Sequence, residues 1–509
     1  MSLEEPFTAR VEEALDRAAE QDVVRRIWDR DHTVWSEDPT EISDRLRWLS
    51  LHETMRPLVE PLRAFAARAA ADGFTRAVLC GMGGSSLAPE VLSGILGPGE
   101  DALALSVLDT THPDDVLAME RSLDLERTLF LVASKSGSTL ETQCHLDYFW
   151  ERTPSGRQFV AITDPGSALE ATARDRDFRE VFAGDAEVGG RYSALSAFGL
   201  VPGALLGVDL VALLDGGAAM AAECGPDVAV RENPAARLGV ALGIAATMGR
   251  DKCTLVLPPE LLPFGPWVEQ LVAESTGKRE RGILPVEGED LGGPDVYGGD
   301  RLFVASAADP GLDALGTAGH PIVAVGGVGP DERSLGGEFF RWELAVAIAG
   351  WIMNINPFDQ PNVQEAKDAT RAILDVGDAE DPGFDRLEPL LDGVGPGDYL
   401  AIHAYLPRND DLVHRLQAAR MRLRDRLRAA TTVGFGPRFL HSTGQLHKGG
   451  PPTGVFVQVD DDPAEDAAIP GRPFTFGELI RAQALGDLRA LRSRGRRVAR
   501  VHLSDLESA

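Results

Sequence analysis

Residues 76–96 read RAVLCGMGGSSLAPEVLSGIL, and the order of residue types in this stretch decides the fold class. RAVLC, at 76–80, is a short apolar run typical of a buried strand. The glycine-rich GMGGSS that follows allows a tight turn, and LAPEVLSGIL has helical spacing. The stretch therefore predicts strand, loop and helix, which is the repeating unit of an α/β protein.

The same strand, loop and helix pattern recurs along the chain in three sets. Short apolar runs separated by helical stretches indicate parallel strands with crossover helices. The predicted strands are 76–80, 103–108, 129–133 and 159–162, then 254–257, 282–286, 302–305 and 322–325, and finally 399–405, 455–459 and 498–503. The predicted helices between and around them are 11–27, 42–71, 235–248, 336–353, 410–430 and 476–494.

The length of 509 residues suggests about three domains at roughly 150 residues each. We predict an α/β protein with two doubly wound parallel-sheet domains and a smaller C-terminal α/β domain. The second set of elements begins after Asn233-Pro234, which suggests an internally duplicated architecture. The predicted boundaries are a helical N-terminal arm at 1–45, a first domain at 46–230, a second at 231–385 and the C-terminal domain at 386–509.

Composition excludes several classes of protein. A formal net charge of −29 argues against a nucleic-acid binder and against adhesion to anionic membranes. It leaves room for an anionic ligand, because a few cations and helix N-termini can form one positive pocket. The four cysteines lie far apart without metal-type spacing, which fits a reducing compartment. With no apolar leader and no apolar run of about 20 residues, we expect a cytoplasmic protein without a membrane partner.

A cluster of hydroxyl side chains is the motif that most clearly indicates a ligand. Residues 134–139 read SKSGST, directly after a predicted strand and at the start of a helix. Four hydroxyls and one ammonium at a helix N-terminus suit a phosphate monoester, and this exceeds what helix capping requires.

Four other motifs are weaker taken singly. Residues 81–86 lack the G-x-G-x-x-G spacing of a dinucleotide site, and a plain turn explains them equally well. Arg191 follows two glycines, as a surface arginine in a turn also would. Gln270 and Glu274 are four apart, so both lie on one helical face, and Glu274 could act as a general base. The loop at 356–362 precedes Lys367, where an ordinary connection is the simpler interpretation.

In this order the five motifs resemble the glucose-6-phosphate isomerase family, whose members are built from two sugar-isomerase (SIS) domains. The resemblance runs from about residue 30 to about 375. The third domain and its segment at 441–451 resemble the isomerase half of bifunctional transaldolase/glucose-6-phosphate isomerases, with the transaldolase half absent. The resemblance implies reversible isomerisation of glucose 6-phosphate and fructose 6-phosphate through a cis-enediol, without metal or other cofactor. It also implies a sugar-phosphate substrate and a homodimer.

Roles follow from the resemblance residue by residue. Glu274 matches the catalytic base, Arg191 the cation beside the reacting carbons, and Lys367 the lysine near the ring oxygen. The substrate-binding positions matched are Gly84, Ser85, Gly190, Gln270 and Gln360, and the phosphate cradle matched is Ser134, Lys135, Ser136 and Thr139. These roles fit the chemistry, since one carboxylate can carry the proton between C1 and C2 while a cation stabilises the enediolate.

One departure concerns ring opening. The family has a histidine, contributed by the neighbouring subunit, a few tens of residues after the base. Here no histidine lies between Glu274 and His320. We therefore hypothesise that His441 or His447, in the loop FLHSTGQLHKGG, enters the site from the third domain. A loop that binds another group or packs at an interface is the alternative.

Two rival functions remain open from the sequence. One is an SIS isomerase of mannose 6-phosphate or an amino sugar, or one with dual specificity. The other is a sugar-phosphate sensor without catalysis, although nothing in the chain resembles a helix-turn-helix.

Overall fold

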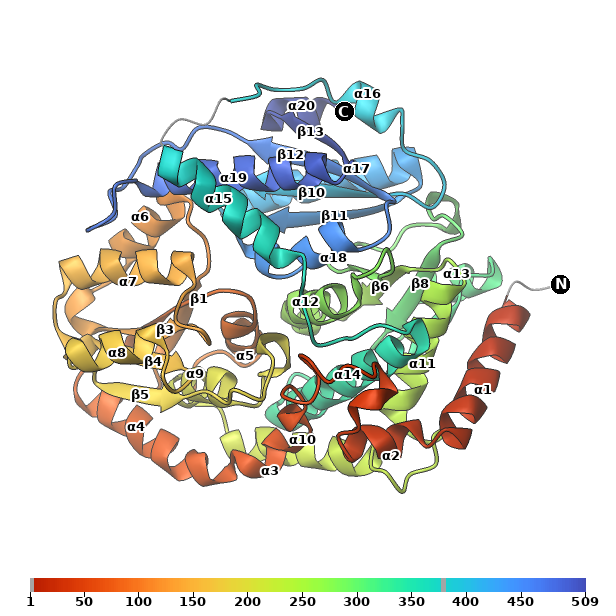
Figure 1. Cartoon of the computed structure of the whole chain (residues 1–509), viewed down its shortest axis with the longest axis horizontal. Helices are drawn as coiled ribbons and strands as arrows, with labels where there is room; N and C mark the ends of the chain where they lie inside the picture. The colour runs from red at the N-terminus through yellow and green to blue at the C-terminus, as the bar shows by residue number, and fades with distance from the viewer. Residues whose placement is uncertain (1–3, 377–380) are drawn as a thin grey trace.

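Three parallel β-sheets organise the chain, and helices surround each of them (Figure 1). The computed structural model describes residues 4–376 and 381–509. In all three sheets the strands follow the same order, with the second strand beside the first and the first beside the third. The predicted fold class is therefore confirmed. The repeated unit occurs three times in the described chain, whereas the sequence suggested a duplication.

The first sheet has the order β2-β1-β3-β4-β5. Its strands are β1 (Arg76–Gly81), β2 (Ala104–Leu108), β3 (Thr128–Ala133), β4 (Phe159–Thr163) and β5 (Glu180–Ala183). Every residue of β3 is buried, as expected for a central parallel strand covered on both faces. Four of these strands confirm the prediction. The fifth, β5, was missed because its four residues are half-buried or exposed and form no apolar run.

The second sheet has the order β7-β6-β8-β9 and the third has β11-β10-β12-β13. Their strands are β6 (Lys252–Val256), β7 (Leu284–Val286), β8 (Arg301–Ala305), β9 (Ile322–Ala324), β10 (Tyr399–Tyr405), β11 (Ala430–Phe435), β12 (Gly454–Asp460) and β13 (Arg497–Val501). Here β11 corrects the sequence analysis, which extended the preceding helix to residue 430. That helix ends at Leu427 because Arg428 adopts a left-handed conformation, with φ of 55°.

Helices connect successive strands along the chain, and others form its N-terminal part. The first ten are α1 (Glu4–Glu20), α2 (Val23–Trp28), α3 (Leu51–Thr54), α4 (Val59–Ala71), α5 (Leu87–Leu96), α6 (Pro113–Ser122), α7 (Leu140–Arg152), α8 (Ala168–Asp175), α9 (Ala197–Leu206) and α10 (Leu210–Glu223). The others are α11 (Pro234–Thr247), α12 (Gly265–Thr276), α13 (Pro310–Thr317), α14 (Glu332–Met353), α15 (Val363–Val376), α16 (Glu388–Leu391), α17 (Asp410–Leu427), α18 (Gly444–Gly449), α19 (Phe476–Ser493) and α20 (Leu503–Ser508).

Local signals explain where several helices begin. Asn233 accepts a hydrogen bond from the Ala236 amide, and Pro234 occupies the first turn of α11. Thr475 and Glu478 form a reciprocal capping box at the start of α19. The predicted helix at 42–71 is only partly confirmed, since regular α-helix there is confined to α3 and α4.

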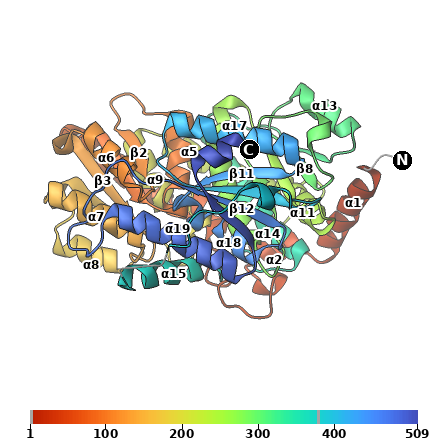
Figure 2. The same ribbon diagram turned by 90° about the horizontal axis from the view of Figure 1, so that it is seen from above.

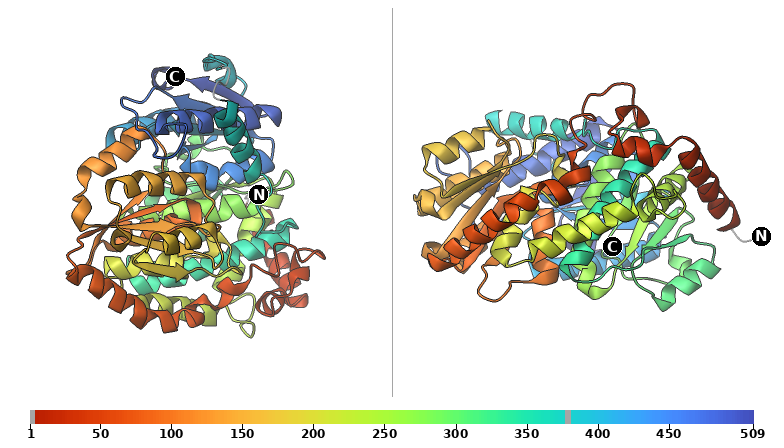
Figure 3. Two further views of the ribbon diagram at one scale, coloured as in Figure 1. Left: turned by 60° about the vertical axis from the view of Figure 1, so that its left-hand side comes forward. Right: turned by 90° about the horizontal axis from the view of Figure 1, so that it is seen from below.

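The C-terminal unit lies across the first two. Figure 3 places the third sheet on the opposite side of the molecule from the N-terminal helices, and Figure 2 shows α19 beside α15. The predicted boundaries at 45/46, 230/231 and 385/386 stay predictions. In the described part of the chain no helix is both long and apolar enough to span a membrane.

Topology places a site at the carboxyl ends of β1 and β3. These strands are neighbours in the sheet, with Gly81 opposite Ala133, although the chain visits β2 between them. Ligands of open α/β sheets bind where the strand order reverses in this way. The glycine turn at 81–86 and the hydroxyl cluster at 134–139 follow these two strands and therefore lie side by side.

Candidate active site

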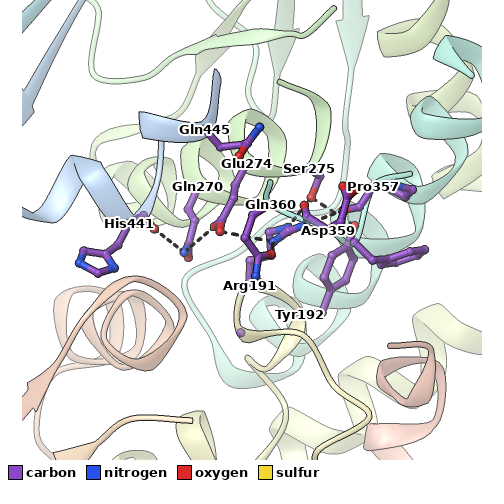
Figure 4. A network of polar contacts seen from close by, with 12 residues as sticks. Arg191, Tyr192, Gln270, Glu274, Ser275, Pro357, Asp359, Gln360, His441 and Gln445 are labelled. Carbon is purple, nitrogen blue, oxygen red and sulfur yellow. Dashed lines mark hydrogen bonds and ion pairs between the residues drawn. The ribbon is translucent and has the colours of Figure 1, made fainter. Parts of the chain in front are cut away.

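Helix α12 carries Gln270 and Glu274 on one face, as their spacing predicted. The opposite face packs into the core through Val268 and Val272, which fixes the direction of the polar face. Gln270 Nε2 donates to Glu274 Oε2 over 3.1 Å. The Glu274 side chain keeps 12% of its surface exposed, so its carboxylate is held and still accessible (Figure 4).

Arg191 uses all of its donor groups at this site. Its Nε donates to Ser275 Oγ at 2.8 Å, and Nη2 donates to the carbonyls of Pro357 at 2.8 Å and Asp359 at 3.0 Å. Its Nη1 donates to Gln360 Oε1 at 2.8 Å and lies 3.4 Å from Glu274 Oε1. The guanidinium therefore makes four hydrogen bonds, and its contact with Glu274 is an ion pair. The Nη1 partners, Gln360 and Glu274, are partly exposed side chains, so Nη1 is the donor that can turn to a substrate.

Gly84 lies against the loop that carries Arg191, and this close contact leaves no room for a side chain. A Cβ at Gly84 would lie 2.1 Å from the carbonyl oxygen of Gly190. Gly84 and Ser85 form a short 3-10 turn, η4 (Gly83–Ser85), and Gly190 and Arg191 form another, η7 (Gly190–Tyr192). The close approach of these turns brings the first and third predicted motifs together.

Lys278 supports the loop that carries Gln360. Its Nζ donates to the Asn356 carbonyl at 2.6 Å and forms an ion pair with Asp359 at 2.5 Å. Burial, with the charge of Arg191 nearby, lowers the pKa of Lys278 to about 7. The sequence analysis gave Lys278 no role, since nothing in its local pattern indicates burial.

A cavity of about 240 Å³ lies beside this network. It opens at the start of α7, where helix N–H groups and hydroxyls can meet an anion. The lining includes the predicted Ser136, Thr139, Lys367 and His441, together with Ser138 and Arg371.

Ser134 and Lys135 face other partners. Ser134 is buried and exchanges a 3.0 Å hydrogen bond with Thr139, so its hydroxyl shapes the turn. Lys135 forms an ion pair with Asp164 and donates to the Asp185 carbonyl at 3.0 Å. Neither residue is among those that line the cavity.

His441 connects the cavity with the carboxylate network. Its carbonyl accepts from Gln270 Nε2 at 2.7 Å, while its ring lies on the far side of the backbone (Figure 4). There the ring Nε2 lies 3.1 Å from Glu141 Oε1. Although burial alone would raise it, the pKa of Glu141 is lowered to about 2 by the charge and hydrogen bond of His441. Glu141 was missed by the sequence analysis, although it stands in the first turn after the hydroxyl cluster.

The other histidines considered from the sequence lie elsewhere. His447 is buried in the C-terminal unit, where its Nδ1 lies 3.0 Å from Nε2 of His403, which in turn contacts Asp487. His320 is buried beside Tyr297 and Phe303. Of the two loop histidines, the structure therefore brings His441 alone to the cavity lining.

The chemistry available here is that of acids, bases and hydrogen bonds. Within residues 4–376 and 381–509, no three His, Cys, Asp or Glu side chains are grouped so as to hold a metal ion. A held carboxylate, a cation at its side and a hydroxyl-lined cavity can together move a proton on an anchored anionic substrate.

Comparison with protein families gives a direct match. The family model for phosphoglucose isomerase matches residues 11–283. The glucose-6-phosphate isomerase of Synechococcus sp. (strain JA-2-3B'a(2-13)) is 32% identical over 359 residues, covering 60% of this chain and 66% of that protein. That of Citrifermentans bemidjiense is 31% identical over 388 residues, covering 64% of this chain and 72% of that protein.

Solved structures show the same fold. A hypothetical protein from Thermus thermophilus has a TM-score of 0.61 and 26% identity, covering 72% of this chain and 98% of that one. A glucose-6-phosphate isomerase from Chlamydia trachomatis has a TM-score of 0.54 and 22% identity, covering 71% and 79%.

Proposed function

Since the chain belongs to the phosphoglucose isomerase family, we propose that it interconverts glucose 6-phosphate and fructose 6-phosphate with Glu274 as the base. The family match and the named relatives support this isomerisation, a reaction of glycolysis and gluconeogenesis. The family predicted from the five motifs is thereby confirmed. The closer resemblance to bifunctional transaldolase proteins stays a prediction.

One observation carries the assignment of the base. Glu274 combines partial exposure with two holding contacts, from Gln270 at 3.1 Å and Arg191 at 3.4 Å, beside the hydroxyl-lined cavity. In the proposed mechanism its carboxylate takes the proton from one of C1 and C2 and returns it to the other. Arg191 stabilises the enediolate through Nη1, which turns from Gln360 and Glu274 toward the developing negative charge.

The phosphate is proposed to occupy the cavity at the start of α7. Ser136, Ser138 and Thr139 supply hydroxyls there, and Arg371 and Lys367 supply positive charge. Lys135, whose ammonium is held by Asp164 and the Asp185 carbonyl, supports the turn in this proposal instead of binding the phosphate directly.

Ring opening is assigned to His441, with Lys367 on the same cavity wall. Glu141 is ionised at neutral pH, so it only accepts hydrogen bonds, and His441 Nε2 must carry the proton between them. His441 Nδ1 is then the ring atom that can exchange a proton with the sugar. The resemblance drew the family's histidine from a neighbouring subunit, whereas His441 belongs to the same chain.

A coupled assay of fructose 6-phosphate conversion tests the base. Glu274→Gln should lower kcat by at least about 10²-fold, because the proton acceptor is lost while the shape is kept. Glu269→Gln, on the same helix, is the matched control. Burial and the neighbouring Glu287 raise the pKa of Glu269 to about 8, so a neutral amide replaces a neutral acid at pH 7. Full activity of Glu274→Gln would overturn the mechanism.

Two rival functions give different results in the same assay. An isomerase of other or dual specificity would turn over mannose 6-phosphate at a comparable kcat/KM. A sensor would bind sugar phosphate, seen by calorimetry, without any turnover in the parent protein.

A homodimer is proposed from the resemblance, and a cytoplasmic location from the composition of the chain. Light scattering of the purified chain measures its oligomeric state. Mixing Glu274→Gln with His441→Ala separates two kinds of site. Sites shared between subunits would regain activity on mixing, and sites complete within one chain would not.

A further inference from the structure

Gln483 links the C-terminal unit to the candidate site. It lies on α19 with only 2% of its surface exposed, and it reaches the edge of the cavity at the start of α7. Its Nε2 donates to Glu141 Oε1 at 2.8 Å, and its Oε1 accepts from the Thr111 hydroxyl at 2.5 Å. Both ends of the amide are therefore engaged.

The orientation of this amide is determined by its partners. The ionised Glu141 carboxylate can only accept, so the NH₂ end must point to it, and the amide oxygen then accepts from the Thr111 hydroxyl. The same oxygen of Glu141 also faces His441 Nε2 at 3.1 Å. The four residues form one continuous line of hydrogen bonds, Thr111–Gln483–Glu141–His441, drawn from loops and helices of both the first and the C-terminal units.

We propose that Gln483 is a positioning residue for ring opening, an inference that rests on the proposed role of His441. Gln483 acts through Glu141. By holding the carboxylate in one rotamer, it fixes the plane and the tautomer of the His441 imidazole, whose Nδ1 then faces the sugar. The C-terminal unit thus supplies both the acid–base group and the residue that orients its carboxylate partner.

Helix α19, which carries Gln483, is held firmly in place by its packing. The helix begins with a capping box at Thr475 and Glu478, and it packs beside α15, which carries Lys367 (Figure 2). One turn after Gln483, Asp487 forms a buried ion pair with Lys448 at 2.6 Å. Movement of Gln483 relative to Glu141 is restricted on both sides, as precise orientation of a catalytic group requires.

Ring opening can be measured apart from isomerisation. Opening and reclosure interconvert the α and β anomers of glucose 6-phosphate, and exchange spectroscopy by NMR reports that rate. Glu274→Gln provides the background, because it blocks proton transfer between C1 and C2 and leaves the ring-opening groups in place. Anomer exchange should persist in this variant.

In that background Gln483→Met should slow enzyme-catalysed anomer exchange by about 10- to 100-fold, the effect of losing a hydrogen bond to a charged group. Thr111→Val, which frees the amide without touching Glu141, should slow it in the same direction. Gln417→Met, a glutamine on α17 in the same unit, is the matched control and should leave the rate unchanged. Melting temperatures identify any variant that fails to fold.

The outcomes separate the two proposals. Unchanged exchange in His441→Ala would overturn the role of His441, and the inference would fall with it. Exchange abolished in His441→Ala but unchanged in Gln483→Met would overturn the inference alone. If Gln483→Met does not fold, Thr111→Val decides: slower exchange supports the positioning role, and an unchanged rate overturns it.

Discussion

Replacing Arg191 with lysine separates the geometry of this cation from its charge. The guanidinium donates in three directions, to Ser275, to Gln360 beside Glu274, and to two backbone carbonyls. A lysine ammonium has three donors on one atom, so it can replace three of the five contacts at most. The Arg191 side chain is only 3% exposed, and water cannot readily replace the lost partners.

The magnitude follows from the donor that faces the substrate. Removing one preorganised donor to a developing oxyanion lowers kcat by about 10²- to 10³-fold, or about 2.7–4 kcal/mol. We expect a loss of this size in kcat/KM for Arg191→Lys in the coupled assay. The Arg25→Lys variant, at an exposed ion pair with Asp227, is the control and should keep the parent activity.

The result must be obtained on folded protein, so circular dichroism and a melting curve accompany each assay. If Arg191→Lys is folded and stays within threefold of the parent, charge alone suffices. The assignment of Nη1 to the enediolate would then be wrong.

Gly84→Ala should lower both kcat/KM and stability, by about 1–3 kcal/mol for the latter, because its Cβ would meet the Gly190 carbonyl at 2.1 Å; thermal and urea unfolding measure this. Between about pH 7 and 10.5 the unfolded chain binds a proton at Lys278 that the folded chain does not, so this group adds stability as the pH rises. Urea unfolding of Lys278→Met across that range should therefore show a weaker rise than the parent. Arg438→Leu should destabilise by about 3–5 kcal/mol, since it leaves the Asp109 carboxylate, now 2.9 Å from the guanidinium, buried without its cation.

Each of these predictions can fail in a defined way. Gly299→Ala, where a Cβ would meet no atom within 4 Å, should be neutral, and an equal loss there would refute the packing explanation for Gly84. An unaltered pH slope in the Lys278 variant would show that this lysine keeps its proton in the folded state across the range from pH 7 to 10.5. If Arg438→Leu is as stable as the parent protein, the units associate without needing this buried ion pair.

Short-range features were predictable from the sequence. The alternation of apolar runs and helical stretches identified the α/β class, and caps such as Asn233 located helix starts. The i, i+4 spacing of Gln270 and Glu274 placed them on one face, because helix geometry alone fixes that relation. Where local signals were weak, prediction failed: β5 has no apolar run, and the helix before β11 ends at Leu427, where the left-handed residue that follows is an arginine, a type that does not signal a helix end.

By itself, then, the sequence determined the α/β class, most of the strands, the order of the five motifs and the family. Only the tertiary structure decided which side chains meet. Arg191 contacts a loop 166–169 residues away, His441 meets Glu141 across 300 residues, and Gln483 meets Glu141 across 342. Lys135, by contrast, is held away from the cavity by Asp164. Periodicity and capping act over a few residues, whereas these contacts depend on how three sheet-and-helix units pack against one another, and no local pattern records that packing.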